Sequence, residues 1–200
     1  NVTRNLMFPF CGGESTRFGG IFDPQGIFDT YGVVKQSADS ISLVAKIGGF
    51  DMRRTITLVP GQPVLRVTAE AVNNGGKPAS INLHSHTNLD LGPLDQTRVR
   101  FENRLGEKVE RDMQPIIAGL REGEHYLDQN APKGSWTLTG AKGLQVTQRF
   151  DDASLDFTWL YAFPAVLNDL EMEVWTKPVM VEPGKSAVFT HEMEITPIAK

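Results

Sequence analysis

Polar and apolar residues alternate with a period of two along most of the chain. In the segment 64–72 (VLRVTAEAV), the Leu, Val and Ala side chains fall on one side of an extended backbone, and Arg, Thr and Glu fall on the other. This alternation is typical of a strand with one buried face. The same pattern predicts strands at 41–47, 53–59, 64–72, 79–91, 135–139, 144–150, 155–161, 170–176 and 186–195.

Turn residues separate these predicted strands. Two prolines and a glycine stand between 53–59 and 64–72, the run NNGG follows at 73–76, and Pro183-Gly184 precedes the last strand. Short strands spaced by such turns indicate an antiparallel β-sandwich or barrel. The predicted strands do not alternate with helices, so a parallel sheet is not expected. We therefore expect an all-β fold, an antiparallel β-sandwich, with residues 1–200 forming one domain.

Two regions lack clear periodicity. The segment 93–134 is polar, so we interpret it as a long excursion with room for two short strands and a helical turn within 112–121, which Pro115 limits. The segment 8–32 is rich in Gly, Phe and Asp and is expected to run over the surface as extended loop and short strand.

Composition narrows the possible partners. The chain of 200 residues has a formal net charge of -4 and no basic cluster beyond Arg53-Arg54, which argues against nucleic acid. No apolar run approaches the roughly 18 residues of a membrane helix, so no membrane partner is expected. Cys11 is the only cysteine and excludes an internal disulfide. No signal peptide is recognisable, which leaves cytoplasm, periplasm and export open.

The segment 82–90 (NLHSHTNLD) is the main candidate for chemistry. In an extended strand, Asn82, His84, His86, Asn88 and Asp90 project from one face. Two imidazoles, two amides and a carboxylate suit a sugar, because hydroxyl groups need paired donors and acceptors. The alternative is a water-facing strand that carries two histidines.

A second candidate lies in the segment 171–176 (EMEVWT). Glu171, Glu173 and Trp175 share one face of the predicted strand. An indole can stack on the C–H face of a pyranose, and a carboxylate can bind hydroxyls or move a proton. The alternative is a solvated strand with a partly covered Trp. His191 lies among apolar residues and is expected to be a core histidine, and Trp159 and Tyr161 are expected to pack in the core.

Residues 30–92 and 144–195 resemble the aldose 1-epimerase (galactose mutarotase) family. The matching pieces are FDMRRTITL at 50–58, LRVTAEAVNN at 65–74, SHTNLDL at 85–91, EVWT at 173–176 and the Pro183-Gly184 turn before the closing strand. The resemblance implies a galactose-mutarotase-like supersandwich that acts on or binds a hexose without a cofactor. The chain departs from the family at several points: no histidine precedes His84, Asn88 stands where the family has an aromatic residue, and the segment between Trp175 and Pro183 is shorter.

The resemblance also implies residue roles. His86 falls at the position of the general acid for the sugar ring oxygen, and Glu173 falls at that of the base for the anomeric hydroxyl. We expect the substrate-binding residues around this pair to be His84, Asn88, Asp90, Glu171 and Trp175. The chain is shorter than such enzymes at its N-terminus, which leaves two alternatives: an incomplete sandwich, or one domain of a larger chain.

Three functions stay open at this stage. The first is a sugar isomerase of the aldose 1-epimerase kind, and the second is a non-catalytic sugar-binding or structural module of a larger glycoside-processing enzyme. The third is a metal-dependent, cupin-like protein in which His84 and His86 share an ion with Asp90, Glu173 or His191. A sandwich leaves exposed sheet edges, so an adjacent domain or a homo-oligomer is an expected partner.

Overall fold

The structure of the chain, a computed structural model, describes residues 31–119, 123–162 and 170–198. These residues form strands β1 (Gly32–Gln36), β2 (Ser40–Ile47), β3 (Phe50–Leu58), β4 (Val64–Asn73), β5 (Ala79–Ile81), β6 (His84–Leu89), β7 (Arg98–Glu102), β8 (Lys108–Asp112), β9 (Gly123–Leu127), β10 (Ser135–Thr139), β11 (Leu144–Phe150), β12 (Leu155–Ala162), β13 (Leu170–Thr176), β14 (Val179–Val181) and β15 (Ser186–Pro197). One helical turn, α2 (Gln114–Ile117), and two 3-10 turns (Leu94–Gln96 and Asp128–Asn130) accompany them.

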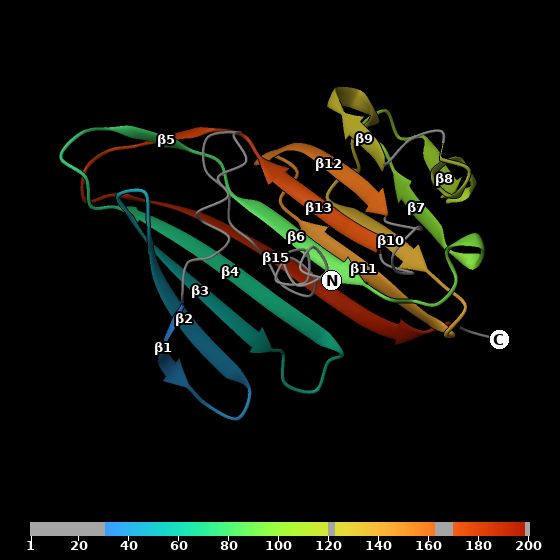
Figure 1. The fold of residues 1–200 in the computed structure, drawn as a ribbon, viewed down its shortest axis with the longest axis horizontal. Coiled ribbons are helices and arrows are strands. Elements are labelled where there is room, and N and C mark those ends of the chain that lie inside the picture. The colour runs from blue at the N-terminus through green and yellow to red at the C-terminus, as the bar shows by residue number, and fades with distance from the viewer. Residues whose placement is uncertain (1–30, 120–122, 163–169, 199–200) are drawn as a thin grey trace, which may run out of the picture.

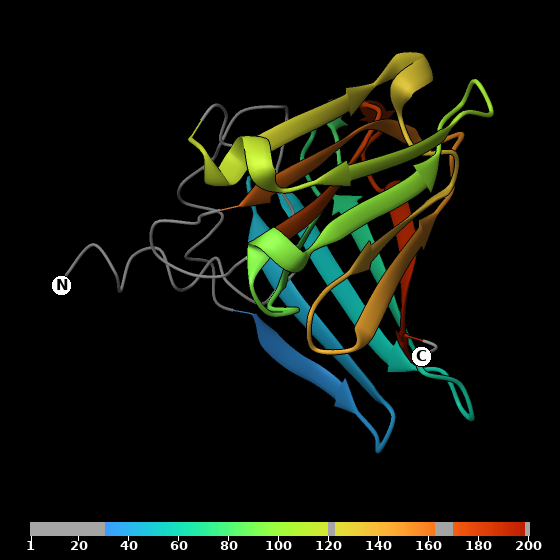
Figure 2. The same ribbon diagram turned by 90° about the vertical axis from the view of Figure 1, so that its right-hand side faces the viewer.

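The strands form two stacked antiparallel sheets and a small ribbon. The large sheet has the order β1-β2-β3-β4-β15-β11-β10-β7-β8, and the small sheet has the order β6-β13-β12-β9. The small sheet lies over the β15, β11 and β10 part of the large one, whereas β1 to β4 extend beyond it (Figure 1, Figure 2). Strands β14 and β5 pair as a separate two-stranded ribbon. The predicted antiparallel β-sandwich is confirmed.

Apolar side chains from the inner faces of both sheets make the core. Trp136 and Leu138 come from β10, and Leu160, Met172 and Val174 come from the small sheet, all fully buried. Each such side chain stabilises the fold by about 1.5–3 kcal/mol relative to exposure. The alternation read along these strands therefore identifies the buried face correctly.

The segment 79–91 is not one strand, and that prediction was wrong. It breaks at Asn82 and Leu83, so that β5 pairs with β14 while β6 pairs with β13. Leu83 donates its N–H to Thr176 Oγ1 at 2.8 Å and accepts the N–H of Thr176 at 2.9 Å. These two bonds fasten the start of β6 to the end of β13. Asn82 is buried at the break, outside the strand that carries His84.

The region 93–134 holds more regular structure than expected. It contains β7 and β8 at one edge of the large sheet, and β9 at one edge of the small sheet. The expected helical turn is present as α2, with Pro115 in its first turn. The expectation for residues 8–32 lies almost entirely outside the described residues.

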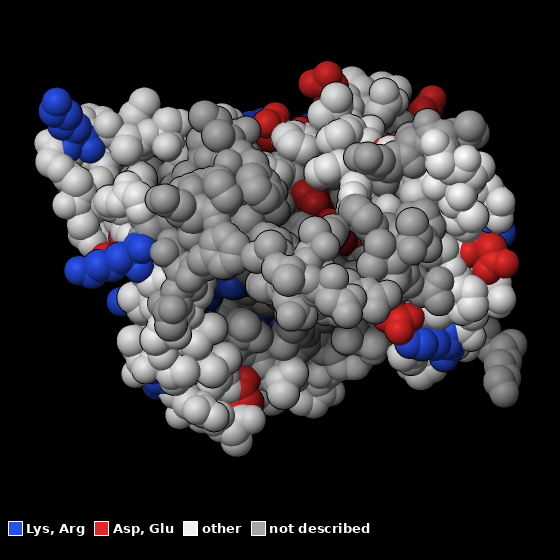
Figure 3. All heavy atoms as spheres, in the orientation of Figure 1, with Lys and Arg blue, Asp and Glu red and all other residues white. Residues whose placement is uncertain are grey.

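Charged side chains of both signs are interspersed over the face of the molecule seen in Figure 3. Several form exposed cross-strand pairs, such as Arg66 with Glu192 and Arg149 with Glu194. Within the described residues, no helix is long and apolar enough to cross a membrane.

Candidate functional site

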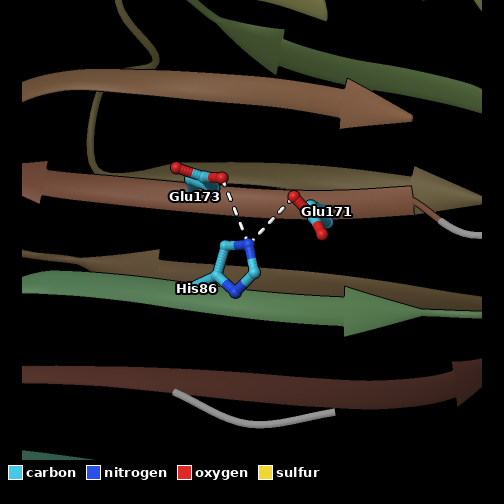
Figure 4. A group of neighbouring side chains, drawn as sticks. All are labelled: His86, Glu171 and Glu173. Atoms are coloured by element: carbon cyan, nitrogen blue, oxygen red, sulfur yellow. Dashed lines mark ion pairs between the residues drawn. The ribbon is translucent and has the colours of Figure 1, made fainter. Parts of the chain in front are cut away.

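Strands β6 and β13 bring the two candidate segments together, although 80 or more residues separate them in the sequence. Their antiparallel register sets His86 opposite Glu173 and His84 opposite Trp175, and Asn88 opposite Glu171. Directly paired residues project from the same face of a sheet. The predicted site residues that lie within these two strands therefore share one face of the small sheet, opposite to the face that packs in the core. In Figure 4, His86 points toward Glu171 and Glu173 on this face.

His86 lies between two carboxylates. Its Nε2 is 2.9 Å from Glu171 Oε2 and 3.3 Å from Glu173 Oε1 (Figure 4). The second oxygen of Glu173, Oε2, is 2.8 Å from Nε2 of His84. The side chains of His86 and Glu173 are only 4% and 3% exposed. Because buried charges are stable only when they are paired, these contacts hold the cluster together as one unit.

The contacts shift the ionisation of both central groups. Burial by itself lowers the pKa of His86, but hydrogen bonds to Glu171 and then Glu173 outweigh it and raise the pKa to about 9. Burial likewise raises the pKa of Glu173, but the hydrogen bonds from His84 and His86 outweigh it and hold the pKa well below its ordinary value. At neutral pH, His86 is therefore protonated and Glu173 is ionised.

Trp175 serves the cluster in a different way from the one predicted. Its indole stacks on the His84 ring at 3.8 Å and on the Phe157 ring at 5.3 Å. Because β13 lies between β6 and β12, these rings cover the two opposite faces of the indole. Its Nε1–H donates to Glu173 Oε2 at 3.0 Å. In this arrangement Trp175 orients Glu173, and neither face of its indole is open to a sugar.

The opposite face of β6 carries a second buried polar network. Ser85 Oγ lies 3.2 Å from His191 Nε2 and accepts a hydrogen bond from Gln148 Nε2 at 3.1 Å. Trp136 donates its Nε1–H to Gln148 Oε1 at 2.7 Å. The prediction that His191 is a satisfied core histidine is confirmed. This network ties the site strand to β11 and β15 of the large sheet.

The structure does not bring every predicted residue into the cluster. Asp90 follows the end of β6, is exposed and pairs with Lys142 at 2.8 Å. The hydrogen bond from Lys142, followed by that from the Gly92 N–H, lowers the pKa of Asp90. Asn88 is a β6 residue paired with Glu171, but its side chain lies outside what the structure describes.

Aromatic residues of β12 and β9 extend the same face, which the sequence analysis missed. Phe157, Trp159 and Tyr161 are paired with Trp175, Glu173 and Glu171. The expectation that Trp159 and Tyr161 pack in the core was wrong. A β-bulge between Leu155 and Phe157 inserts one extra residue and changes the alternation, so that Leu155 is in the core while the aromatic residues are not. His125 of β9 pairs with Trp159 on this face.

Comparison with known proteins gave matches at the level of structure. No family model and no curated protein sequence matches the chain. A galactose mutarotase-like protein from Lactobacillus casei superposes with a TM-score of 0.67 at 10% identity, covering 94% of this chain and 83% of that one. The chain has the galactose mutarotase-like fold.

Two further structures support the same fold. A galactose mutarotase-related enzyme from Lactobacillus acidophilus has a TM-score of 0.66 at 14% identity, covering 88% of this chain and 74% of that one. An aldose epimerase homologue from C. elegans has a TM-score of 0.66 at 12% identity, covering 87% and 70%. Superpositions of this quality establish the fold, but at identities this low the function must be argued from the site of this chain.

The cluster also contains a possible donor set for a metal ion. One donor atom each from His86, Glu171 and Glu173 lie within 4.8 Å of one another. This set differs from the predicted one, which combined His84 with His86. A ligating histidine ordinarily donates a hydrogen bond from its other ring nitrogen. Nδ1 of His86 is buried, and the described residues offer it no hydrogen-bond partner of this kind.

Proposed function

We propose that this chain binds a hexose on the outward face of the small sheet and interconverts its anomers, with His86 as the acid and Glu173 as the base. The observation that carries the proposal is the direct contact of these two buried groups, whose Nε2 and Oε1 atoms are 3.3 Å apart. Each favours the charged form of the other, so an acid and a base stand ready side by side at neutral pH.

The proposed reaction needs one proton donor and one proton acceptor. Glu173 accepts the proton of the anomeric hydroxyl while His86 donates its proton to the ring oxygen, and the bond between C1 and the ring oxygen breaks to leave an open-chain aldehyde. Rotation about the bond between C1 and C2 presents the other face of the carbonyl. Ring closure then reforms the bond, and both protons return to their original groups.

The surrounding residues support this division of roles. Glu171 is a second carboxylate on the His86 Nε2 atom, at 2.9 Å, and favours the protonated form of the imidazole before the proton is transferred to the sugar. His84 and Trp175 both bond to Glu173 Oε2, which leaves Oε1 on the side of His86. Because these contacts hold the base in one orientation, little reorganisation is needed in the transition state.

Polarimetry tests the proposal directly. Freshly dissolved α-glucose and α-galactose are followed with wild-type protein, with Glu173→Gln and without protein. We expect wild-type protein to accelerate the approach to the equilibrium rotation and Glu173→Gln to fall close to the spontaneous rate. Unaltered mutarotation with micromolar wild-type protein on both sugars would contradict the catalytic proposal.

A non-catalytic sugar-binding module is the second candidate. One sequence observation favours it: no histidine precedes His84, so the earlier histidine of the aldose 1-epimerase family has no counterpart here. Calorimetric titration with glucose and galactose separates the two candidates. Binding without accelerated mutarotation would favour the module.

The metal-dependent alternative keeps a simple test of its own. The three donor atoms around His86 are close enough to share an ion, but a proton on His86 occupies the same lone pair. Elemental analysis of protein purified without a His tag shows whether a metal ion, in place of a proton, is bound at His86. One equivalent of a transition metal would replace the acid–base proposal.

A further inference from the structure

The outward face of the small sheet continues beyond the acid–base pair. Trp159 of β12 is paired with Glu173 on one side and with His125 of β9 on the other. Tyr161 is likewise paired with Glu171 and with Gly123. Since adjacent strands lie about 4.8 Å apart, His125 is two strands, or about 10 Å, from Glu173. The proposed chemistry uses none of these aromatic residues.

Trp159 and His125 form an ordered surface. Their rings stack at 4.7 Å with planes 11° apart, and the Tyr161 ring meets the indole edge-on at 5.1 Å. Trp159 and Tyr161 are half-buried and His125 is exposed, whereas Trp175 is 9% exposed and covered on both faces. We call Trp159, Tyr161 and His125 the aromatic surface.

The position of the Trp159 indole depends on Gly123 of β9. A Cβ added at this position would collide with Nε1 of Trp159 and would lie 2.6 Å from the carbonyl oxygen of Leu160. Any larger residue at 123 would therefore push the indole of Trp159 out of its position against β9. The absence of a side chain at 123 and the stacked His125 ring together hold Trp159 in one place.

We propose that the aromatic surface binds the second sugar unit of a neutral, reducing oligosaccharide whose reducing end lies at His86 and Glu173. Aromatic rings pack against the C–H faces of pyranoses. Glu171, with a side chain 17% exposed, stands between the two positions and can accept hydrogen bonds from hydroxyl groups. This inference rests on the proposed function, because it extends the same ligand from the same acid–base pair.

The charges on this face indicate a neutral ligand. The positions of β6, β13, β12 and β9 that share the face carry His, Asn, Glu, aromatic, Gly and Leu residues, and none of these positions carries Lys or Arg. A phosphorylated sugar would meet two carboxylates, and these strands offer it no Lys or Arg in addition to the His86 imidazolium, which the carboxylates already neutralise. The ligand class is therefore an uncharged oligosaccharide of two or more units.

The test compares a monosaccharide with a disaccharide that has the same reducing end. KM for mutarotation, and Kd by calorimetry, are measured for glucose and for maltose with wild-type protein, Trp159→Ala and His125→Ala. Met180→Ala, an exposed apolar residue of β14 outside this face, is the matched control. Thermal unfolding confirms that each variant is folded, and His125→Ala provides a second probe at an exposed position.

We expect wild-type protein and Met180→Ala to have a KM for maltose about tenfold below that for glucose. In Trp159→Ala and His125→Ala, this tenfold preference should disappear. If glucose is a substrate but maltose is no better, or if both variants weaken glucose and maltose equally, the second-unit site is wrong while the proposed function stands. If neither sugar binds or reacts, both fail.

Discussion

The two faces of strand β6 hold two buried polar networks of different kinds. On the outward face, His84 and His86 meet carboxylates, whereas on the core face Ser85 meets the neutral amide of Gln148 and the ring of His191. Both networks are buried to a similar degree. The difference teaches that burial alone does not mark a reactive site. The outward network contains carboxylates and a protonated imidazole, whereas the core network links the small sheet to the large sheet.

The largest expected effect is on activity and belongs to the outward face alone. Glu173→Gln keeps the shape of the side chain but removes the base, so we expect the catalysed rate of mutarotation to fall about 10³-fold. Polarimetry measures the rate, with the exposed Asp90→Asn as the control that should leave it unchanged. A Glu173→Gln protein within tenfold of wild type would show that the charge of Glu173 is not used in the reaction.

The next effect is on stability and belongs to the core face. Gln148→Ala leaves the indole N–H of Trp136 without its acceptor and opens a cavity, so we expect the free energy of unfolding to fall by about 3 kcal/mol. Urea denaturation measures the change. Gln145→Ala on the same strand, where the side chain is only half-buried, should cost less than about 0.5 kcal/mol. Equal losses of unfolding free energy in the two variants would mean that the hydrogen bonds of Gln148 in the core network do not stabilise the fold.

The pH dependence of stability separates the two faces further. The pKa of His86 is raised to about 9 in the folded protein from 6.5, so its contribution is complete below pH 6.5 and is lost as the pH rises through 9. We expect the stability difference between wild type and His86→Gln to shrink by about 3 kcal/mol between pH 6 and pH 10. Urea denaturation at several pH values measures it. If the stability difference between wild type and Gln148→Ala shrank by the same amount over this pH range, the two networks would not differ in charge as described.

The smallest expected effect comes from removing an indole N–H donor, Trp175 on the outward face or Trp136 on the core face. Trp175→Phe keeps a stacked ring but removes the N–H bond to Glu173, so we expect kcat to fall about tenfold, or ~1.4 kcal/mol, with little change in KM. Trp136→Phe removes the equivalent bond to Gln148 and should lower stability while kcat is retained. A rise in KM for Trp175→Phe with unchanged kcat would instead assign the indole to substrate binding.

Alternation along the sequence was enough to predict much of the fold and the centre of the site. Strands β6 and β13 have clean patterns, so the faces of His86 and Glu173 could be assigned before their pairing was known. Their side-by-side placement depends on a register between distant segments, and only the family resemblance indicated that. The stacking on Trp175 depends on the same register and could not be foreseen.

The errors have local physical causes. The extra residue of the bulge, Asp156, disguises a strand that otherwise alternates, and so hid the aromatic surface. The break at Leu83 follows from bonds to Thr176, which no short-range pattern shows. Strand β8 is the edge strand of the large sheet and β7 is its neighbour, and both carry exposed charges, so their sequences resembled a polar loop.

The ring stack around Trp175 has a consequence for spectroscopy. The chain has three tryptophans, and Trp175 is the one whose indole both stacks on a histidine and donates to the candidate base. A protonated imidazole in van der Waals contact quenches indole emission, and a nearby carboxylate shifts its wavelength. The intrinsic fluorescence of this residue should therefore report whether the stack on His84 and the hydrogen bond to Glu173 are intact, without any label.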